Sequence, residues 1–223
     1  MFDAHRHLTD EREIQDALYC TSYQAEWPVV INLPYPGIGA LGALADRGLP
    51  PIEDLALALE SLPHLQVGEV GLDKRFGDLE GQQRFLLSAL DLAFSLGRSI
   101  TVHVVQSDGL FLSCLEQAGS RLPTILWHGF TGSVETARIA SDKGCILSLA
   151  PGIEHTRLAK RLEELSSLPF AIETDYDTQE KPYEQTLEEQ YSLIGGLMHK
   201  DRDTLIRNNR AKRAILTNNA PPR

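Results

Sequence analysis

The first residues of the chain contain a pattern that could hold a metal ion. His5 and His7 are separated by one residue in the stretch Phe2-Asp3-Ala4-His5-Arg6-His7-Leu8. Side chains of a β-strand alternate between its two faces, so the two imidazoles share one face of a predicted strand. On the same pattern Asp3 joins the histidine face, and the opposite face carries Phe2, Ala4 and Arg6. Two neutral imidazoles side by side can bind one divalent cation and leave room for a carboxylate or water.

Four more side chains of similar chemistry come late in later apolar segments. They are Glu69 in 68–73, His103 in 100–105, His128 in 125–130 and Asp175 in 170–175. Each has an ordinary structural alternative, such as a hydrogen-bonded core histidine, a salt-bridge partner or a helix cap. Taken together these alternatives fail, because four imidazoles and two carboxylates buried without charge compensation cost several kcal/mol each. Divalent metal would compensate all six.

The elements that must position these groups alternate along the chain. Short apolar runs predict strands near 2–8, 17–22, 28–33, 66–72, 99–105, 124–129, 145–150 and 170–175. Amphipathic periodicity predicts helices over 52–62, 80–97, 133–143, 155–166, 183–199 and 201–216. This pattern favours an α/β fold, a TIM (β/α)₈ barrel that is short and irregular in its first third. The barrel would collect the six side chains at one rim.

We expect one domain over residues 1–217 and a frayed tail over 218–223. The segment 34–51 is rich in glycine and proline and follows a predicted strand, so it is expected to be a βα loop on the active-site face. Its role stays open.

Composition bounds the class of protein. A length of 223 residues with 42% hydrophobic and 23% charged residues is typical of a globular protein with one substantial core. Met1 is followed at once by a strand, and no apolar run reaches the roughly 20 residues of a membrane span, so we expect no signal peptide and no membrane contact. Three cysteines without C-x-x-C spacing favour reduced thiols and a cytoplasmic location.

The net charge restricts the partners. A formal charge of -10 does not suit a non-specific duplex binder, which usually presents a basic face. Any nucleic acid would have to be held where bound metal supplies positive charge. The sequence predicts no protein partner and leaves the oligomeric state open.

These residues together resemble the TatD family of metal-dependent deoxyribonucleases, within the amidohydrolase-type metal barrels. The matching pieces are Asp3-Ala4-His5-Arg6-His7-Leu8, Gly68-Glu69-Val70-Gly71-Leu72-Asp73, Val102-His103, His128-Gly129-Phe130-Thr131-Gly132-Ser133, Glu173-Thr174-Asp175 and the late Asn209. They occur in the family's order over nearly the whole chain.

The resemblance implies a site with two divalent ions. His5 and His7 would bind one ion, with Asp175 as a further ligand and as general base for the attacking water. Glu69, also expected to be a catalytic residue, would bridge to a second ion held by His103 and His128. Nitrogen and oxygen ligands permit zinc, manganese or magnesium, and the sequence leaves the choice open.

The surroundings of this metal set depart from the family's pattern. The third-strand histidine is missing from Pro34-Tyr35-Pro36-Gly37-Ile38-Gly39-Ala40, no arginine follows His103 closely, and Asp175-Tyr176-Asp177 replaces Asp-Ala-Pro. Lys74 and Gln106 are weak candidates for contact with substrate. The sequence therefore supports a hydrolytic reaction more strongly than it supports DNA as the substrate of that reaction.

The sequence is compatible with three functions. The leading one is a hydrolase that cleaves DNA phosphodiester bonds from an end with metal-activated water. The first alternative directs the same metal site at a small amide, ester or phosphoester. The second is a metal-binding barrel without catalysis.

Overall fold

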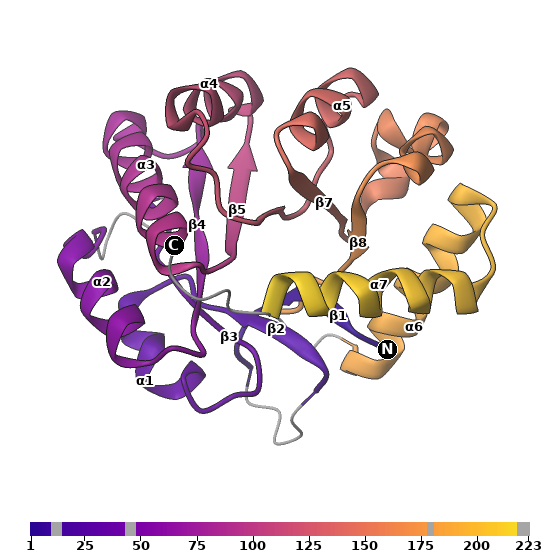
Figure 1. Ribbon diagram of the computed structural model, residues 1–223. Helices are drawn as coiled ribbons and strands as arrows, with labels where there is room; N and C mark the ends of the chain where they lie inside the picture. The colour runs from indigo at the N-terminus through magenta and orange to yellow at the C-terminus, as the bar shows by residue number, and fades with distance from the viewer. Residues whose placement is uncertain (10–14, 43–47, 178–180, 218–223) are drawn as a thin grey trace.

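Eight parallel strands form one sheet whose spatial order follows the sequence (Figure 1). The computed structural model describes residues 1–9, 15–42, 48–177 and 181–217. The strands are β1 (Asp3–Arg6), β2 (Ala17–Cys20), β3 (Pro36–Ile38), β4 (Gln66–Asp73), β5 (Ile100–Val105), β6 (Ile125–Trp127), β7 (Cys145–Leu149) and β8 (Phe170–Ile172). Backbone bonds from Asp175 N to His5 O (3.1 Å) and from His7 N to Tyr176 O (3.0 Å) join the two ends of the sheet. The predicted TIM barrel is confirmed.

Helices lie around the outside of the sheet (Figure 1). They are η1 (Gln24–Glu26), α1 (Trp27–Val30), α2 (Ile52–Ser61), α3 (Leu79–Leu96), α4 (Asp108–Ala118), α5 (Val134–Asp142), η3 (Ile153–His155), η4 (Leu158–Ser167), α6 (Tyr183–Met198) and α7 (Arg202–Thr217). Asp78 accepts a hydrogen bond from Gly81 N at the start of α3, and Gly97 ends that helix with φ +66°. The predicted helix over 155–166 is of the 3₁₀ type, since this segment holds the end of η3 and most of η4. The helix α4 was not predicted.

The predicted strand 28–33 was wrong. This segment contains α1 followed by a turn, and the third strand is β3 within the predicted loop 34–51. Pro28 stands in the first turn of α1, where its missing N–H costs nothing. Val30 is buried but Val29 is 61% exposed, so only one face of this apolar run is buried. A strand of a barrel would be buried on both faces.

The core has two layers. The larger one joins the outer face of the sheet to the helices. The smaller one fills the barrel interior with strand residues and one helical leucine, namely Phe2, Ala4, Leu18, Cys20, Leu126, Ile146, Ala171 and Leu216.

The face assignment within β1 was wrong in part. Phe2 and Ala4 belong to the interior layer, whereas Asp3 contacts Thr174 N at 2.9 Å and the Thr174 hydroxyl at 2.6 Å. The reason is a register shift between Asp3 and Arg6, where three steps along β1 oppose two along β2. Such a bulge breaks simple alternation and re-aims the side chains that follow it.

The helix α7 stabilises the seam between β1 and β8. Asn209 is fully buried, and its amide oxygen accepts from Ile172 N at 2.7 Å. Its amide nitrogen donates to Ile172 O at 2.7 Å and to Phe2 O at 2.9 Å. One side chain therefore satisfies three buried backbone groups of two strands.

No helix in the described part of the chain is long and apolar enough to cross a bilayer. The predicted tail 218–223 lies outside the described residues.

Candidate metal centre

The six predicted ligands meet at the carboxyl end of the barrel. Glu69 lies at the centre of the group: its Oε1 is 2.7 Å from His128 Nε2 and 2.9 Å from His103 Nδ1. Its Oε2 is 3.4 Å from His7 Nε2 and 3.8 Å from His5 Nε2. The two oxygens of Glu69 therefore face two different pairs of histidines.

Asp175 closes the group on the side of β1. Its Oδ1 is 3.3 Å from Nε2 of His5 and 3.3 Å from Nε2 of His7. The carboxylate is 40% exposed, whereas Glu69 and His5 are buried. Asp175 thus connects the buried ligands to the surface.

Among the described residues, two groups of three have ligand atoms that all lie within 4.8 Å of one another. One is His5, His7 and Asp175, the set expected for the first ion. The other is His5, Glu69 and His128, so His5 stands here where the sequence prediction had His103. His103 remains adjacent, since its Nδ1 is 2.9 Å from His128 Nε2.

The arrangement fits a divalent cation. Two atoms bound to the same ion at about 2.1 Å lie roughly 3 Å apart, which is close to the nitrogen–oxygen separations around Glu69. Both ring nitrogens of His5 and Oε2 of Glu69 are buried without a hydrogen-bond partner among the described residues. Buried polar atoms in such a state are costly, and a bound metal would satisfy His5 Nε2 and Glu69 Oε2, which lie 3.8 Å apart.

Two further carboxylates orient the histidines from behind, and sequence reasoning missed both. Glu173 Oε1 accepts from His128 Nδ1 at 3.3 Å, and Asp73 Oδ2 lies 3.3 Å from His103 Nε2. Glu173 also accepts from Gly129 N at 2.7 Å and from the Ser148 hydroxyl. A proton held on the outer nitrogen of each ring leaves the inner nitrogen with its lone pair toward Glu69, as metal-binding histidines require. The signal available in the sequence was an acidic residue inside each of two quoted motifs, 68–73 and 173–175.

The charges in this cluster depend strongly on one another. Burial raises the pKa of Glu69, but His128 and His103 outweigh it and hold that pKa well below its ordinary value. Burial raises the pKa of Asp175, but the His5 and His7 rings beside it outweigh burial and lower that pKa. Burial lowers the pKa of His7, yet Asp175 and Glu69 raise it to about 9. Without metal, the cluster therefore retains protons that a cation would displace.

The segment after β3 fixes the backbone at Glu69. A Cβ at Gly39 would come within 2.7 Å of the amide nitrogen and carbonyl carbon of Glu69. Thr21 connects Gly39 to β4. Its hydroxyl accepts a hydrogen bond from Gly39 N and donates one to Gly39 O, and its carbonyl accepts one from Glu69 N at 2.9 Å. The loose segment 34–51 thus contains a residue that positions the central ligand.

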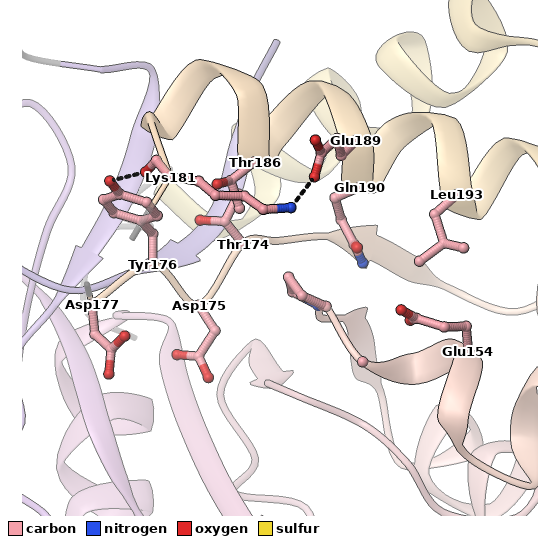
Figure 2. A pocket seen from close by; sticks show the side chains of 12 residues that line it. Glu154, Thr174, Asp175, Tyr176, Asp177, Lys181, Thr186, Glu189, Gln190 and Leu193 are labelled. Carbon is pink, nitrogen blue, oxygen red and sulfur yellow. Dashed lines mark hydrogen bonds and ion pairs between the residues drawn. The ribbon is translucent and has the colours of Figure 1, made fainter. Parts of the chain in front are cut away.

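Asp175 lines two of the cavities that the described residues form. The larger, of about 470 Å³, lies between the segment after β8, η3 and α6 (Figure 2). Its charged lining residues besides Asp175 are Glu154, Asp177, Lys181 and Glu189, and Lys181 Nζ is 2.8 Å from Glu189. The smaller, of about 280 Å³, is lined by His103, His128 and Arg75 among others.

The predicted substrate contacts Lys74 and Gln106 are both exposed, and neither is among the described residues that line these two cavities. Arg75, the neighbour of Lys74, does line the smaller one.

Comparison with known proteins identifies the family. The model of the TatD related DNase family matches residues 44–195, more than half of the 223 residues. The chain belongs to the TatD-related DNase family. The matched range contains Glu69, His103, His128 and Asp175, whereas His5 and His7 precede it.

Individual members of the TatD family agree with this result. A protein of Salmonella typhimurium named 3'-5' ssDNA/RNA exonuclease TatD is 31% identical over 135 residues, which cover 56% of this chain and 51% of that protein. The Escherichia coli protein of the same name is 28% identical over 130 residues, covering 55% and 50%. The chain spans about half the length of the curated relatives it matches.

Solved structures show the same fold over almost the whole chain. YJJV, a TatD homolog from Escherichia coli, superposes with a TM-score of 0.80 at 21% identity, covering 99% of this chain and 98% of the other. A TatD family hydrolase from Entamoeba histolytica gives a TM-score of 0.71 at 12% identity, covering 98% of each chain.

Proposed function

We propose that this chain is a metal-dependent exonuclease that hydrolyses phosphodiester bonds at the ends of single-stranded DNA or RNA. The observation that carries the proposal is the convergence of His5, His7, Glu69, His103, His128 and Asp175 around one small space. The named relatives, called 3'-5' ssDNA/RNA exonucleases, support the substrate class and the direction.

The ligand assignment that we propose uses two ions. His5, His7 and Asp175 would hold one ion, and His103 with His128 would hold the other. Glu69 would bridge, in keeping with its two oxygens facing the two histidine pairs. Divalent ions in such a centre lower the pKa of coordinated water and offset the charge of a phosphate. The nitrogen and oxygen donors suit zinc, manganese or magnesium.

Asp175 is the proposed general base. It stands at the border of both cavities and is partly exposed, so a water molecule can reach it. Its lowered pKa keeps it ionised at neutral pH, the state in which a carboxylate accepts a proton. Glu69 is less suited to proton transfer because it is buried behind the histidines, and its role is to hold the centre together.

One observation favours a second candidate, a hydrolase for a small amide, ester or phosphoester. The larger cavity beside Asp175 carries three carboxylates besides it, from Glu154, Asp177 and Glu189, against one lysine. Such a lining disfavours a polyanion and suits a small neutral or cationic group. The three cysteines are buried and unpaired, which supports the expected cytoplasmic location for either activity.

The experiment compares substrates on protein purified without chelator. Linear single-stranded DNA, linear duplex and closed circular duplex are offered side by side with manganese or magnesium, and metal content is measured on the same sample. We expect trimming of single strands and resistance of the closed circle. Rapid nicking of the closed circle would contradict end trimming. Bound metal with no activity on any of the three would favour the small-substrate hydrolase, and absence of metal binding would remove the mechanism.

Two variants separate metal binding from chemistry. Asp175→Asn should retain most of the metal but lose turnover by about a hundredfold to ten-thousandfold, the usual effect of removing a general base. Glu69→Ala should lose metal itself. An unchanged kcat in Asp175→Asn would rule out its role as base.

A further inference from the structure

The smaller cavity beside the metal centre contains a cation that the ligand set does not use. Arg75 is the second residue after β4 and lines this cavity together with His103, His128 and Asp175. Among the described residues that line it, Arg75 is the one lysine or arginine, and Asp175 is the one carboxylate. The cavity is therefore the more electropositive of the two that adjoin Asp175.

Arg75 is held in a defined position. Its Nε donates to Asp73 Oδ1 at 3.0 Å and its Nη2 to Asp73 Oδ2 at 2.6 Å, a bidentate pair. Asp73 is buried and lies against His103, so the guanidinium is anchored to the back of the metal centre. The Nη1 group takes part in neither bond, and the side chain is 53% exposed. A held guanidinium with one edge open to a cavity is suited to a phosphate oxygen.

The larger cavity offers the opposite electrostatic surroundings. Its lysine, Lys181, is also paired with a carboxylate, at 2.8 Å from Glu189. The difference lies in the remaining groups, because no lysine or arginine among the described lining residues pairs with Glu154 or Asp177, whose side chains Figure 2 shows. A phosphate would meet net negative charge there and a guanidinium at the smaller cavity.

We propose that Arg75 binds a phosphate of the nucleic-acid strand next to the one being cleaved, so that the strand enters the site along the carboxyl ends of β4, β5 and β6. The assignment rests on the proposed nuclease function and adds a phosphate-binding residue to it. Thr131, which follows β6 and lines the same cavity, offers a hydroxyl donor to the same phosphate. The acidic cavity on the other side of Asp175 then receives the terminal nucleoside, which brings no further phosphate.

The test measures binding apart from turnover. Arg75→Gln and Arg75→Lys are prepared in the Asp175→Asn background, and binding of a fluorescein-labelled single-stranded oligothymidylate is followed by anisotropy in the presence of manganese. Arg84→Gln is the matched control, since Arg84 is an exposed arginine of α3 with one distant partner, Glu80, at 3.8 Å. It removes the same charge from a residue outside the cavity lining.

We expect Arg75→Gln to raise the Kd about tenfold or more, the effect of losing one hydrogen bond between charged groups. It should also reduce the slope of log K against log salt by about 0.7, the value for one phosphate of a single strand. Arg75→Lys should retain the salt slope and lose part of the affinity, because lysine keeps the charge without the fork. Arg84→Gln should change neither quantity.

The outcomes separate this inference from the function on which it rests. If the wild-type protein trims the oligonucleotide and the Asp175→Asn parent binds it, but Arg75→Gln behaves like Arg84→Gln, Arg75 does not bind phosphate. If Arg75→Gln loses manganese and affinity together while its salt slope stays unchanged, Arg75 only supports Asp73, and the assignment is overturned. If the parent binds no oligonucleotide at all, the proposed nuclease function itself fails.

Discussion

At the scale of single residues, the centre depends on carboxylates of two kinds. Glu69 and Asp175 face the histidine nitrogens that would carry metal. Glu173 and Asp73 face the opposite ring nitrogens and hold the rings in place. This division determines which ring nitrogen of His103 and His128 holds a proton and which one is turned inward, where a metal would bind.

Removal of the negative charge at Glu173 tests this division. Glu173→Gln should weaken metal binding about tenfold to a hundredfold, because the amide no longer favours the proton on His128 Nδ1. The measurement is a titration of manganese or zinc against a chelating dye. Glu164→Gln is the control, since Glu164 is a surface residue paired with Arg161 at 2.6 Å. Equal affinities of the two variants would contradict the orienting role of Glu173.

The raised pKa of His7 predicts how metal binding depends on pH. In the metal-free protein Asp175 and Glu69 raise this pKa to about 9, so His7 carries a proton below that pH. Metal requires the neutral ring and must displace the proton. Apparent affinity should therefore rise with pH, about tenfold per unit for each proton released, and level off above about pH 9. Calorimetry in buffers of different ionisation enthalpy counts the protons, and pH-independent affinity would refute the prediction.

At the scale of elements, the short strand β3 and the residues after it position Glu69. Gly39 packs directly on the Glu69 backbone, and Trp27 of α1 donates to Gly39 O at 2.9 Å. The irregular first third of the barrel is thus part of the site, since it lets two backbones approach more closely than side chains would allow.

A methyl group at Gly39 should disturb the centre. Gly39→Ala would place a Cβ against the backbone of Glu69, which must move. We expect lower thermal stability and weaker metal binding together, with a loss of about 1–3 kcal/mol for an overpacked buried position. Gly196→Ala in α6 is the matched control, because its Cβ meets nothing within 4 Å and alanine favours a helix. Thermal unfolding and metal titration of both variants make the comparison.

At the scale of the whole molecule, the net charge of the chain opposes binding of the proposed substrate. The chain has a formal net charge of -10, and the nucleic acid that it is proposed to cleave is also an anion. Attraction must then be confined to the metal centre and the cations beside it.

This opposition predicts a shallow salt dependence. With two or three phosphates neutralised, the slope of log K against log salt for single-stranded DNA should be no steeper than about -2. Anisotropy titrations of the Asp175→Asn protein over a range of salt concentrations measure it. A slope as steep as that of a duplex-binding protein with many phosphate contacts would show a basic surface that the charge distribution does not predict.

Much of the fold and the ligand set followed from local pattern. The periodicity of 80–97 predicted α3, and apolar runs predicted all strands except β3, because periods of two and 3.6 are properties of neighbouring residues. The six candidate ligands could be named for the same reason, since His5 and His7 share one face of a strand pattern and the other four each stand late in an apolar run. Their metal-binding roles remain proposals.

Tertiary structure decided what depends on register and on contacts between distant segments. The bulge in β1 re-aimed the histidines relative to Asp3, and the apolar run after Trp27 became a helix while β3 took the third place in the sheet. The same holds for Arg75, which the sequence does not distinguish from Lys74. Only the packing of β4 against β5 brings Asp73, the anchor of Arg75, to His103, because that contact joins residues thirty positions apart.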